Sequence, residues 1–98
     1  PVSATTFTDQ IFIPNSFTPN GDGRNDKLFV YGYIIKSMRF VVFNQWGEKI
    51  FESKDQSIGW DGTSKGKPQP SGVYIYVCEL NLTNGTTLVK KGSINLIR

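Results

Sequence analysis

The run VYIYVCEL, residues 73–80, constrains the fold more than any other stretch of the sequence. Its apolar side chains fall on both faces of an extended chain, whereas a strand exposed on one face alternates apolar and polar residues. We therefore expect a central strand of a two-layer structure. Asn84-Gly85 lies just downstream, and both residues tolerate the positive φ angles of a type I′ turn. This predicts a hairpin between residues 73–83 and 86–97.

Shorter strand-like runs precede this hairpin, and no segment carries a convincing helical stripe. Alternation and aromatic or β-branched residues predict further strands at 10–14, 27–32, 36–44 and 48–53. Trp46 lies between the last two, at the expected tip of a hairpin, and should be exposed. Six or seven short strands without helices predict an all-β fold, an immunoglobulin-like antiparallel β-sandwich of about seven strands.

Individual residues carry expectations within this sandwich. Gly92 could interrupt the last strand, 86–98, with a bulge. Trp60 belongs to the polar segment 53–72 and should be buried where that segment crosses between sheets or covers an end; a sugar-stacking role is the alternative. Asp61 should accept hydrogen bonds from the backbone amides that follow it. Cys78 is the only cysteine, which excludes an internal disulfide, and its apolar neighbours indicate a buried, inert thiol.

The stretch FTPNGDGRND, residues 17–26, gathers oxygen-bearing side chains around two glycines. Aligned on its Asp-Gly pair with a calcium loop, it offers three side chains and one backbone carbonyl to a cation. These candidate ligands are Asn20, Asp22, Arg24 (its carbonyl) and Asp26. Thr18 and Phe29 stand where such a loop has its opening and closing carboxylates. The alternative is an ordinary turn, in which Asn20 and Asp22 accept hydrogen bonds from nearby N–H groups. Calcium is the one candidate cofactor.

Composition argues against catalysis and against nucleic-acid binding. The chain has no histidine, which removes the commonest general base and the usual transition-metal ligand. The net charge of +3 comes from scattered residues and forms no basic stripe that could read a groove. No apolar run reaches the ~18–20 residues of a membrane-spanning helix. We expect a monomeric, non-enzymatic domain over residues 10–98, with residues 1–9 a linker remnant.

Four motif-bearing stretches follow one another in a specific order: IPNSFTPNGDGRND, FVVFNQWGEKIFES, WDGTSKGKPQPSGVYIYV and the final KGSINLIR. In this combination the chain resembles the gliding-motility-associated C-terminal domain of Bacteroidetes proteins, also called the type B sorting domain of the type IX secretion system. The similarity runs from about Ile11 to Arg98. The resemblance implies a C-terminal secretion signal of a large adhesin or enzyme, with no catalytic residue of its own.

The resemblance also implies partners and a route. Such a domain is read by type IX translocon components and by an outer-membrane protein of the PorP/SprF type. Its cargo passes through the periplasm and ends at the cell surface or outside the cell. The runner-up interpretation is a calcium-stabilised β-sandwich that binds glycan or protein on its own account.

Candidate recognition residues lie at the chain end and at one hairpin. A folded signal needs exposed strand edges or end loops to be recognised. The terminal strand is one candidate, with Arg98 expected at a solvent-exposed strand end, and the hairpin tip is the other. The candidate residues are Ile94, Leu96, Ile97, Arg98 and Trp46.

We expect Asp22→Ala to destabilise the domain by about 0.5–2 kcal/mol, the cost of a lost capping acceptor, in calcium and in chelator alike. Bound calcium at ~100 times its dissociation constant would add about 2.7 kcal/mol to wild-type stability. Thermal melts of both proteins with calcium and with chelator check this. A wild-type midpoint that is the same in both removes the metal site, and an unshifted Asp22→Ala midpoint removes the capping role.

Overall fold

The structure is a computed structural model that describes residues 11–19 and 26–98. All regular elements in these residues are strands, which confirms the predicted all-β, sandwich-like fold. The strands are β1 (Ser16–Phe17), β2 (Ile35–Phe43), β3 (Lys49–Ser53), β4 (Thr63–Ser64), β5 (Lys67–Pro68), β6 (Gly72–Leu82) and β7 (Thr87–Leu96). The expected linker at 1–9 lies outside the described residues and stays a prediction.

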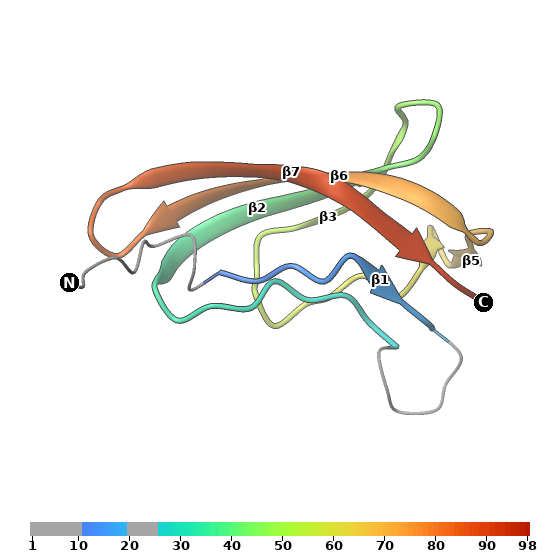
Figure 1. The fold of residues 1–98 in the computed structure, drawn as a ribbon, viewed down its shortest axis with the longest axis horizontal. Helices are drawn as coiled ribbons and strands as arrows, with labels where there is room; N and C mark the ends of the chain where they lie inside the picture. Colours follow the sequence, from blue (N-terminus) through green and yellow to red (C-terminus); the bar gives the residue numbers. More distant parts are fainter. Residues whose placement is uncertain (1–10, 20–25) are drawn as a thin grey trace.

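Five of these strands form one sheet in the order β1-β7-β6-β2-β3. β6 contains the run 73–80 and lies between β7 and β2, so the predicted central strand is confirmed. Neighbouring strands are antiparallel except β1 and β7, which are parallel. The sheet is therefore mixed rather than antiparallel throughout. Figure 1 shows it arching over a second layer that is built from residues 11–15 and 26–34, and β1 continues from this layer to the edge of β7.

The second layer contains two predicted strands, at 10–14 and 27–32, that the structure does not form as continuous strands. Only isolated bridges occur there, between Phe12 and Tyr31 and between Leu28 and Trp60. The side chains do alternate, with Ile11 and Ile13 buried and Phe12 exposed between them. The backbone partner changes within a few residues, so no ladder becomes long enough to be a strand.

Both long hairpins use a three-residue loop with glycine at its last position. In the first, the N–H of Gly47 donates to the carbonyl of Asn44 at 3.1 Å, and Gly47 has a φ of 78°. In the second, the N–H of Gly85 donates to the carbonyl of Leu82 at 3.0 Å, and Gly85 has a φ of 89°. This is a type I turn followed by a left-handed residue, which matches the twist of the flanking strands.

The type I′ turn that we predicted at Asn84-Gly85 is therefore wrong. Gly85 has a positive φ but Asn84 does not. The side-chain Oδ1 of Asn84 instead accepts the N–H of Thr86 at 2.9 Å, a local bond that the negative φ allows. Positive φ at two successive residues occurs at Lys65 and Gly66, which connect β4 to β5.

Gly92 does not form the predicted bulge, because the β6–β7 ladder is continuous from Gly72–Leu96 to Asn81–Thr87. Gly92 lies directly across from Tyr76 in this ladder. A Cβ atom at Gly92 would stand only 2.9 Å from the Tyr76 ring. The glycine therefore gives an aromatic side chain room to lie across β7.

The core between the layers is centred on Trp60, which is fully buried, as predicted. Its ring lies 5.2 Å from Phe17 and 5.2 Å from Tyr74, measured between centroids. The indole N–H donates to the carbonyl of Thr63 at 2.9 Å. Burial excludes Trp60 as a sugar platform. The segment 53–72 thus crosses from the sheet edge into the second layer and carries a core residue with it.

We expect Gly92→Ala to destabilise the domain by about 1–3 kcal/mol, because the added methyl group overlaps the Tyr76 ring. In a Tyr76→Leu background the same substitution should cost close to nothing, since the ring is gone. Urea unfolding of the four proteins measures this coupling as a double-mutant cycle. An equal cost of Gly92→Ala in both backgrounds would contradict the packing argument.

Candidate recognition surface

The structure separates the predicted recognition residues of the terminal strand into two groups. Ile94 and Leu96 are buried, with exposed fractions of 0% and 1%, and belong to the core under the sheet. A partner of the folded domain cannot touch them. Ile97 is 51% exposed and lies on the opposite face, as the alternation along a strand requires.

Arg98 is exposed at the end of the terminal strand, as expected, but its backbone and side chain are hydrogen-bonded within the domain. Its backbone N–H donates to Ser71 Oγ at 2.9 Å. Its Nε donates to the carbonyl of Gln69 at 2.7 Å, and its Nη2 donates to the carbonyl of Gly62 at 2.8 Å. The guanidinium therefore clamps both ends of the β4–β5 hairpin, because its planar fork can reach two carbonyls at once.

Trp46 is 83% exposed at the tip of the β2–β3 hairpin, which confirms its predicted exposure. Its backbone N–H donates to Asn44 Oδ1 at 2.9 Å, and the same oxygen accepts the N–H of Glu48 at 3.0 Å. Asn44 Nδ2 also donates to Glu48 Oε1 at 3.0 Å. A large aromatic side chain is thus presented on a turn that its own hydrogen bonds hold in shape. Such residues are enriched among binding hot spots.

Sequence reasoning missed an apolar surface on the outer face of the sheet. Val73 and Ile75 on β6 are 49% and 46% exposed, and Phe43 lies next to Ile75 in the ladder. The signal was present, since the run 73–80 is apolar on both faces. The second layer of the described residues covers only one of these faces, which leaves Val73 and Ile75 on the outer one.

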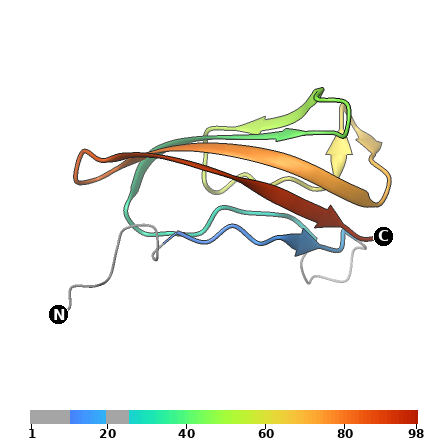
Figure 2. The same cartoon turned by 45° about the horizontal axis from the view of Figure 1, so that its top comes forward.

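These exposed apolar residues gather at one end of the domain. Figures 1 and 2 both place the β2–β3 turn at the same end of the long axis as the C-terminus, away from the β6–β7 hairpin. Val73 pairs with Asn95, two residues before Ile97. We call the set Trp46, Val73, Ile75 and Ile97 the end surface. It contains aliphatic and aromatic side chains and no charged ones.

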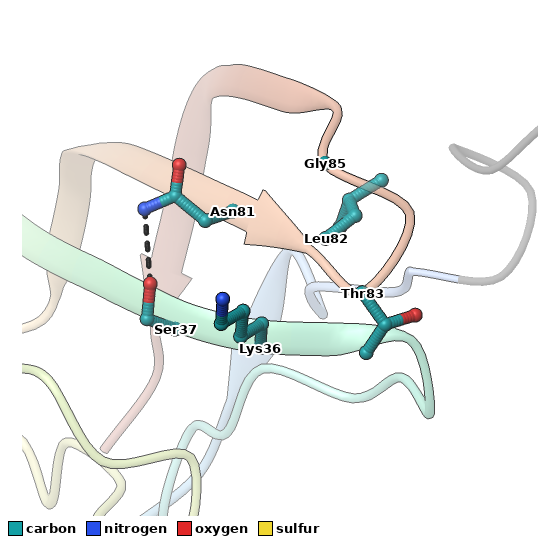
Figure 3. A pocket seen from close by; sticks show the side chains of 6 residues that line it. All are labelled: Lys36, Ser37, Asn81, Leu82, Thr83 and Gly85. Carbon is teal, nitrogen blue, oxygen red and sulfur yellow. Dashed lines mark hydrogen bonds between the residues drawn. The ribbon is translucent and has the colours of Figure 1, made fainter.

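A hollow of about 340 Å³ lies near the β6–β7 turn, lined by residues of β2 and of this hairpin. Figure 3 shows Asn81 Nδ2 donating to Ser37 Oγ, at 2.9 Å. Asn81 Oδ1 also accepts the hydroxyl of Thr87 at 3.2 Å. Both the nitrogen and the oxygen of the Asn81 amide are hydrogen-bonded within the domain. This side chain therefore holds the hairpin in place and does not point to a bound ligand.

The candidate calcium site falls largely outside the described residues. Asn20, Asp22 and Arg24 lie in that part of the chain, whereas Asp26 lies within the structure. Among residues 11–19 and 26–98, no three His, Cys, Asp or Glu side chains group together as a metal site would need. Calcium binding at this loop therefore stays a prediction.

Two smaller predictions are confirmed. Asp61 Oδ1 accepts the N–H of Thr63 at 3.0 Å and its hydroxyl at 2.6 Å. Cys78 is fully buried, and this burial raises the pKa of its thiol to about 11. The thiol is therefore protonated at neutral pH and cannot react as a thiolate.

Comparison with known proteins identifies the family of the chain. The family model of the CHU_C type IX secretion signal domain matches residues 11–96, nearly all of the sequence. A search of curated proteins found no match. In the part of the chain that the structure describes, no helix has the length and apolar character needed to span a membrane.

We expect Arg98→Ala to lower the free energy of unfolding by about 1–3 kcal/mol, because two hydrogen bonds from a charged group are lost. Amide hydrogen exchange across residues 62–69 should become faster in the same variant. Arg98→Lys should recover little of the loss, since an ammonium group lacks the planar fork. A melting midpoint of Arg98→Ala equal to that of wild type would show that the clamp does not stabilise the fold.

Proposed function

Because the chain belongs to the family of type IX secretion signal domains, we propose that it carries a large adhesin or enzyme through the periplasm to the translocon. Family membership itself establishes the role of secretion signal, the interaction with the type IX system, and export to the cell surface or beyond. The nature of the cargo, the periplasmic step and a link to gliding motility are parts of the proposal.

The partner that we propose to read the domain is an outer-membrane protein of the PorP/SprF type, together with translocon components. The end surface is the proposed contact. Its support is the combination of Trp46 on a hydrogen-bonded turn with half-exposed Val73, Ile75 and Ile97. A fully desolvated aromatic anchor beside aliphatic neighbours is the usual centre of a protein interface.

The Arg98 clamp has a different part in this proposal. It fixes the β4–β5 hairpin to the terminal strand and so keeps this end of the domain rigid. A rigid surface binds with a smaller loss of conformational entropy than a mobile one. Arg98 is then a positioning residue, and Trp46 and Ile97 make the contact.

We also propose that the domain acts as a monomer and has no catalytic activity of its own. The sequence contains no histidine, and the described residues contain no group of three or more Cys, Asp or Glu side chains that could hold a metal ion. The observation that carries the proposal as a whole is the family match over residues 11–96, which covers the strands that build the end surface.

The domain, fused behind a periplasmically targeted reporter, should direct that reporter out of a type IX-competent cell. Trp46→Ser should reduce export by about tenfold, which corresponds to roughly 1.4 kcal/mol of lost binding. The melting midpoint should not change, because Trp46 is 83% exposed in the folded domain. The measurement is reporter in the medium and on the surface against reporter in the periplasm.

Tyr33→Ser is the matched control for this experiment. Tyr33 is an aromatic residue that is even more exposed than Trp46, at 98%. It lies two residues before β2, beside the β6–β7 hairpin at the other end of the domain. Its loss should leave export unchanged. Retention of the intact fusion in the periplasm would refute the sorting role, and equal export by both variants would refute the end surface.

A further inference from the structure

The edge of β7 is only partly paired, and the backbone hydrogen bonds near its end show which backbone groups point outward. The N–H groups of Asn95 and Ile97 donate to the carbonyls of Asn15 and Phe17, at 2.8 and 3.1 Å. In an antiparallel ladder, alternate residues turn both backbone groups to the same side. The odd-numbered residues of β7 therefore face away from β6.

β1 covers this edge only at the end of β7, because it pairs with Asn95 and Leu96 alone. Farther back along the strand, the outward N–H and C=O groups of Val89, Lys91 and Ser93 have no backbone partner in the part of the chain that the structure describes. A row of alternate unpaired donors and acceptors is a template for an added strand.

The hydroxyl group of a mostly buried tyrosine lies at the same edge. Tyr76 is 8% exposed, and its hydroxyl oxygen lies 2.9 Å from the position that a Cβ of Gly92 would take, so the ring reaches across β7. This hydroxyl forms no hydrogen bond with another described residue. Since no buried side-chain oxygen in the described residues lacks a partner, the hydroxyl is open to solvent. Desolvation by burial raises the pKa of Tyr76, so the hydroxyl keeps its proton and can donate at neutral pH.

Lys90 adds a positive charge on the same side of β7. It pairs with Cys78 in the ladder, two residues from Gly92, and therefore projects to the same face as the Tyr76 ring. Its side chain is partly buried and forms no ion pair within the described residues. The nearest acid in register, Glu79, is across from Val89 on the other face and lies 3.7 Å from Arg39.

We propose that the open edge at Val89–Ser93 accepts an extended strand of the export machinery, one of whose side chains is a carboxylate facing Lys90 and Tyr76. The backbone groups of β7 would supply the pairing, and the ammonium and hydroxyl donors would select the acid. A second copy of this chain fits the edge poorly, because Lys90 and Lys91 of the two copies would be brought together. This inference rests on the proposed secretion role and names a second contact for it.

The first test compares Lys91→Pro with Lys91→Ala in the reporter fusion. Both variants lose the same side chain, but only proline removes the outward N–H and places ring atoms where a strand would approach. The bonds between β7 and β6 use the even-numbered residues and stay intact. We expect Lys91→Pro to lower export by about tenfold relative to Lys91→Ala, as one backbone hydrogen bond left unmade implies. The two melting midpoints should be similar.

The second test addresses the proposed carboxylate and does not depend on a backbone change. Tyr76→Phe removes only the hydroxyl, and Lys90→Gln removes only the charge at nearly constant size. Each should lower export several-fold, and the double variant should lose less than the product of the two effects, since both donors serve one acceptor. Thr87→Ala, at the start of the same strand, is the control and should export like wild type.

The outcomes separate this inference from the secretion role. If the wild-type fusion is exported and folded Lys91→Pro is exported equally well, the edge is not used and the inference is wrong. If Lys91→Pro fails to fold, export of both Tyr76→Phe and Lys90→Gln at the wild-type level refutes it. A dimer of the isolated domain that Lys91→Pro dissociates would assign the edge to a second copy and would also overturn it. A wild-type fusion that stays in the periplasm refutes the secretion role instead.

Discussion

The burial of one indole ring joins the parts of this domain. Trp60 comes from the long segment between β3 and β4, Phe17 from β1, and Tyr74 from the central strand β6. The Trp60 ring contacts each of the other two. The backbone of Trp60 pairs with Leu28, so the second layer is attached at the same point. A buried aromatic cluster of this size contributes more to stability than any surface contact in the domain. The position of β1 beside β7 depends on it, because Phe17 is its buried anchor.

The rigid end of the domain is built outward from that cluster. The hydroxyl of Tyr74 donates to the carbonyl of Pro70 at 2.6 Å, and the guanidinium of Arg98 donates to the carbonyls of Gln69 and Gly62. Gly62 follows Trp60 by two residues, so the core and the clamp share one short stretch of chain. The apolar end surface is therefore presented by a framework with few degrees of freedom. A signal that is read while folded benefits from this, since the entropy of ordering has already been lost on folding.

Side-chain periodicity predicted which residues are buried better than it predicted how the backbone is paired. The central strand, buried Trp60 and exposed Trp46 were all predicted from local patterns, because burial and turn geometry determine which residue types occur at neighbouring positions. The segments 10–14 and 27–32 alternate as strands do, yet their backbones form only single bridges. The side chain of Asn84 accepts a hydrogen bond from the N–H of Thr86 within the turn, and the Asn-Gly dipeptide alone does not predict this bond. Trp46 and Ile97 of the end surface were predicted as candidates, whereas Val73, Ile75 and the Arg98 clamp were missed. Which face of a strand is covered and which carbonyls an arginine reaches both depend on residues distant in sequence.

The β3 edge and the part of β7 that β1 leaves uncovered differ in how their charged side chains are paired. At the β3 edge, Glu52 accepts from Lys49 at 2.8 Å and from Arg39 at 2.7 Å, and hydrogen bonds from these two side chains lower the pKa of Glu52 to about 2. That edge strand is short, its pairing is irregular next to Phe43, and its Glu52 is paired with basic side chains of the same domain. The edge of β7 carries Lys90 and Lys91 with no acid paired to them in the described structure. Edge lysines discourage pairing with a like strand but favour an acidic one. The unpaired lysines of β7 disfavour pairing with a second copy of this edge and favour a partner of opposite charge, as the proposed strand addition requires.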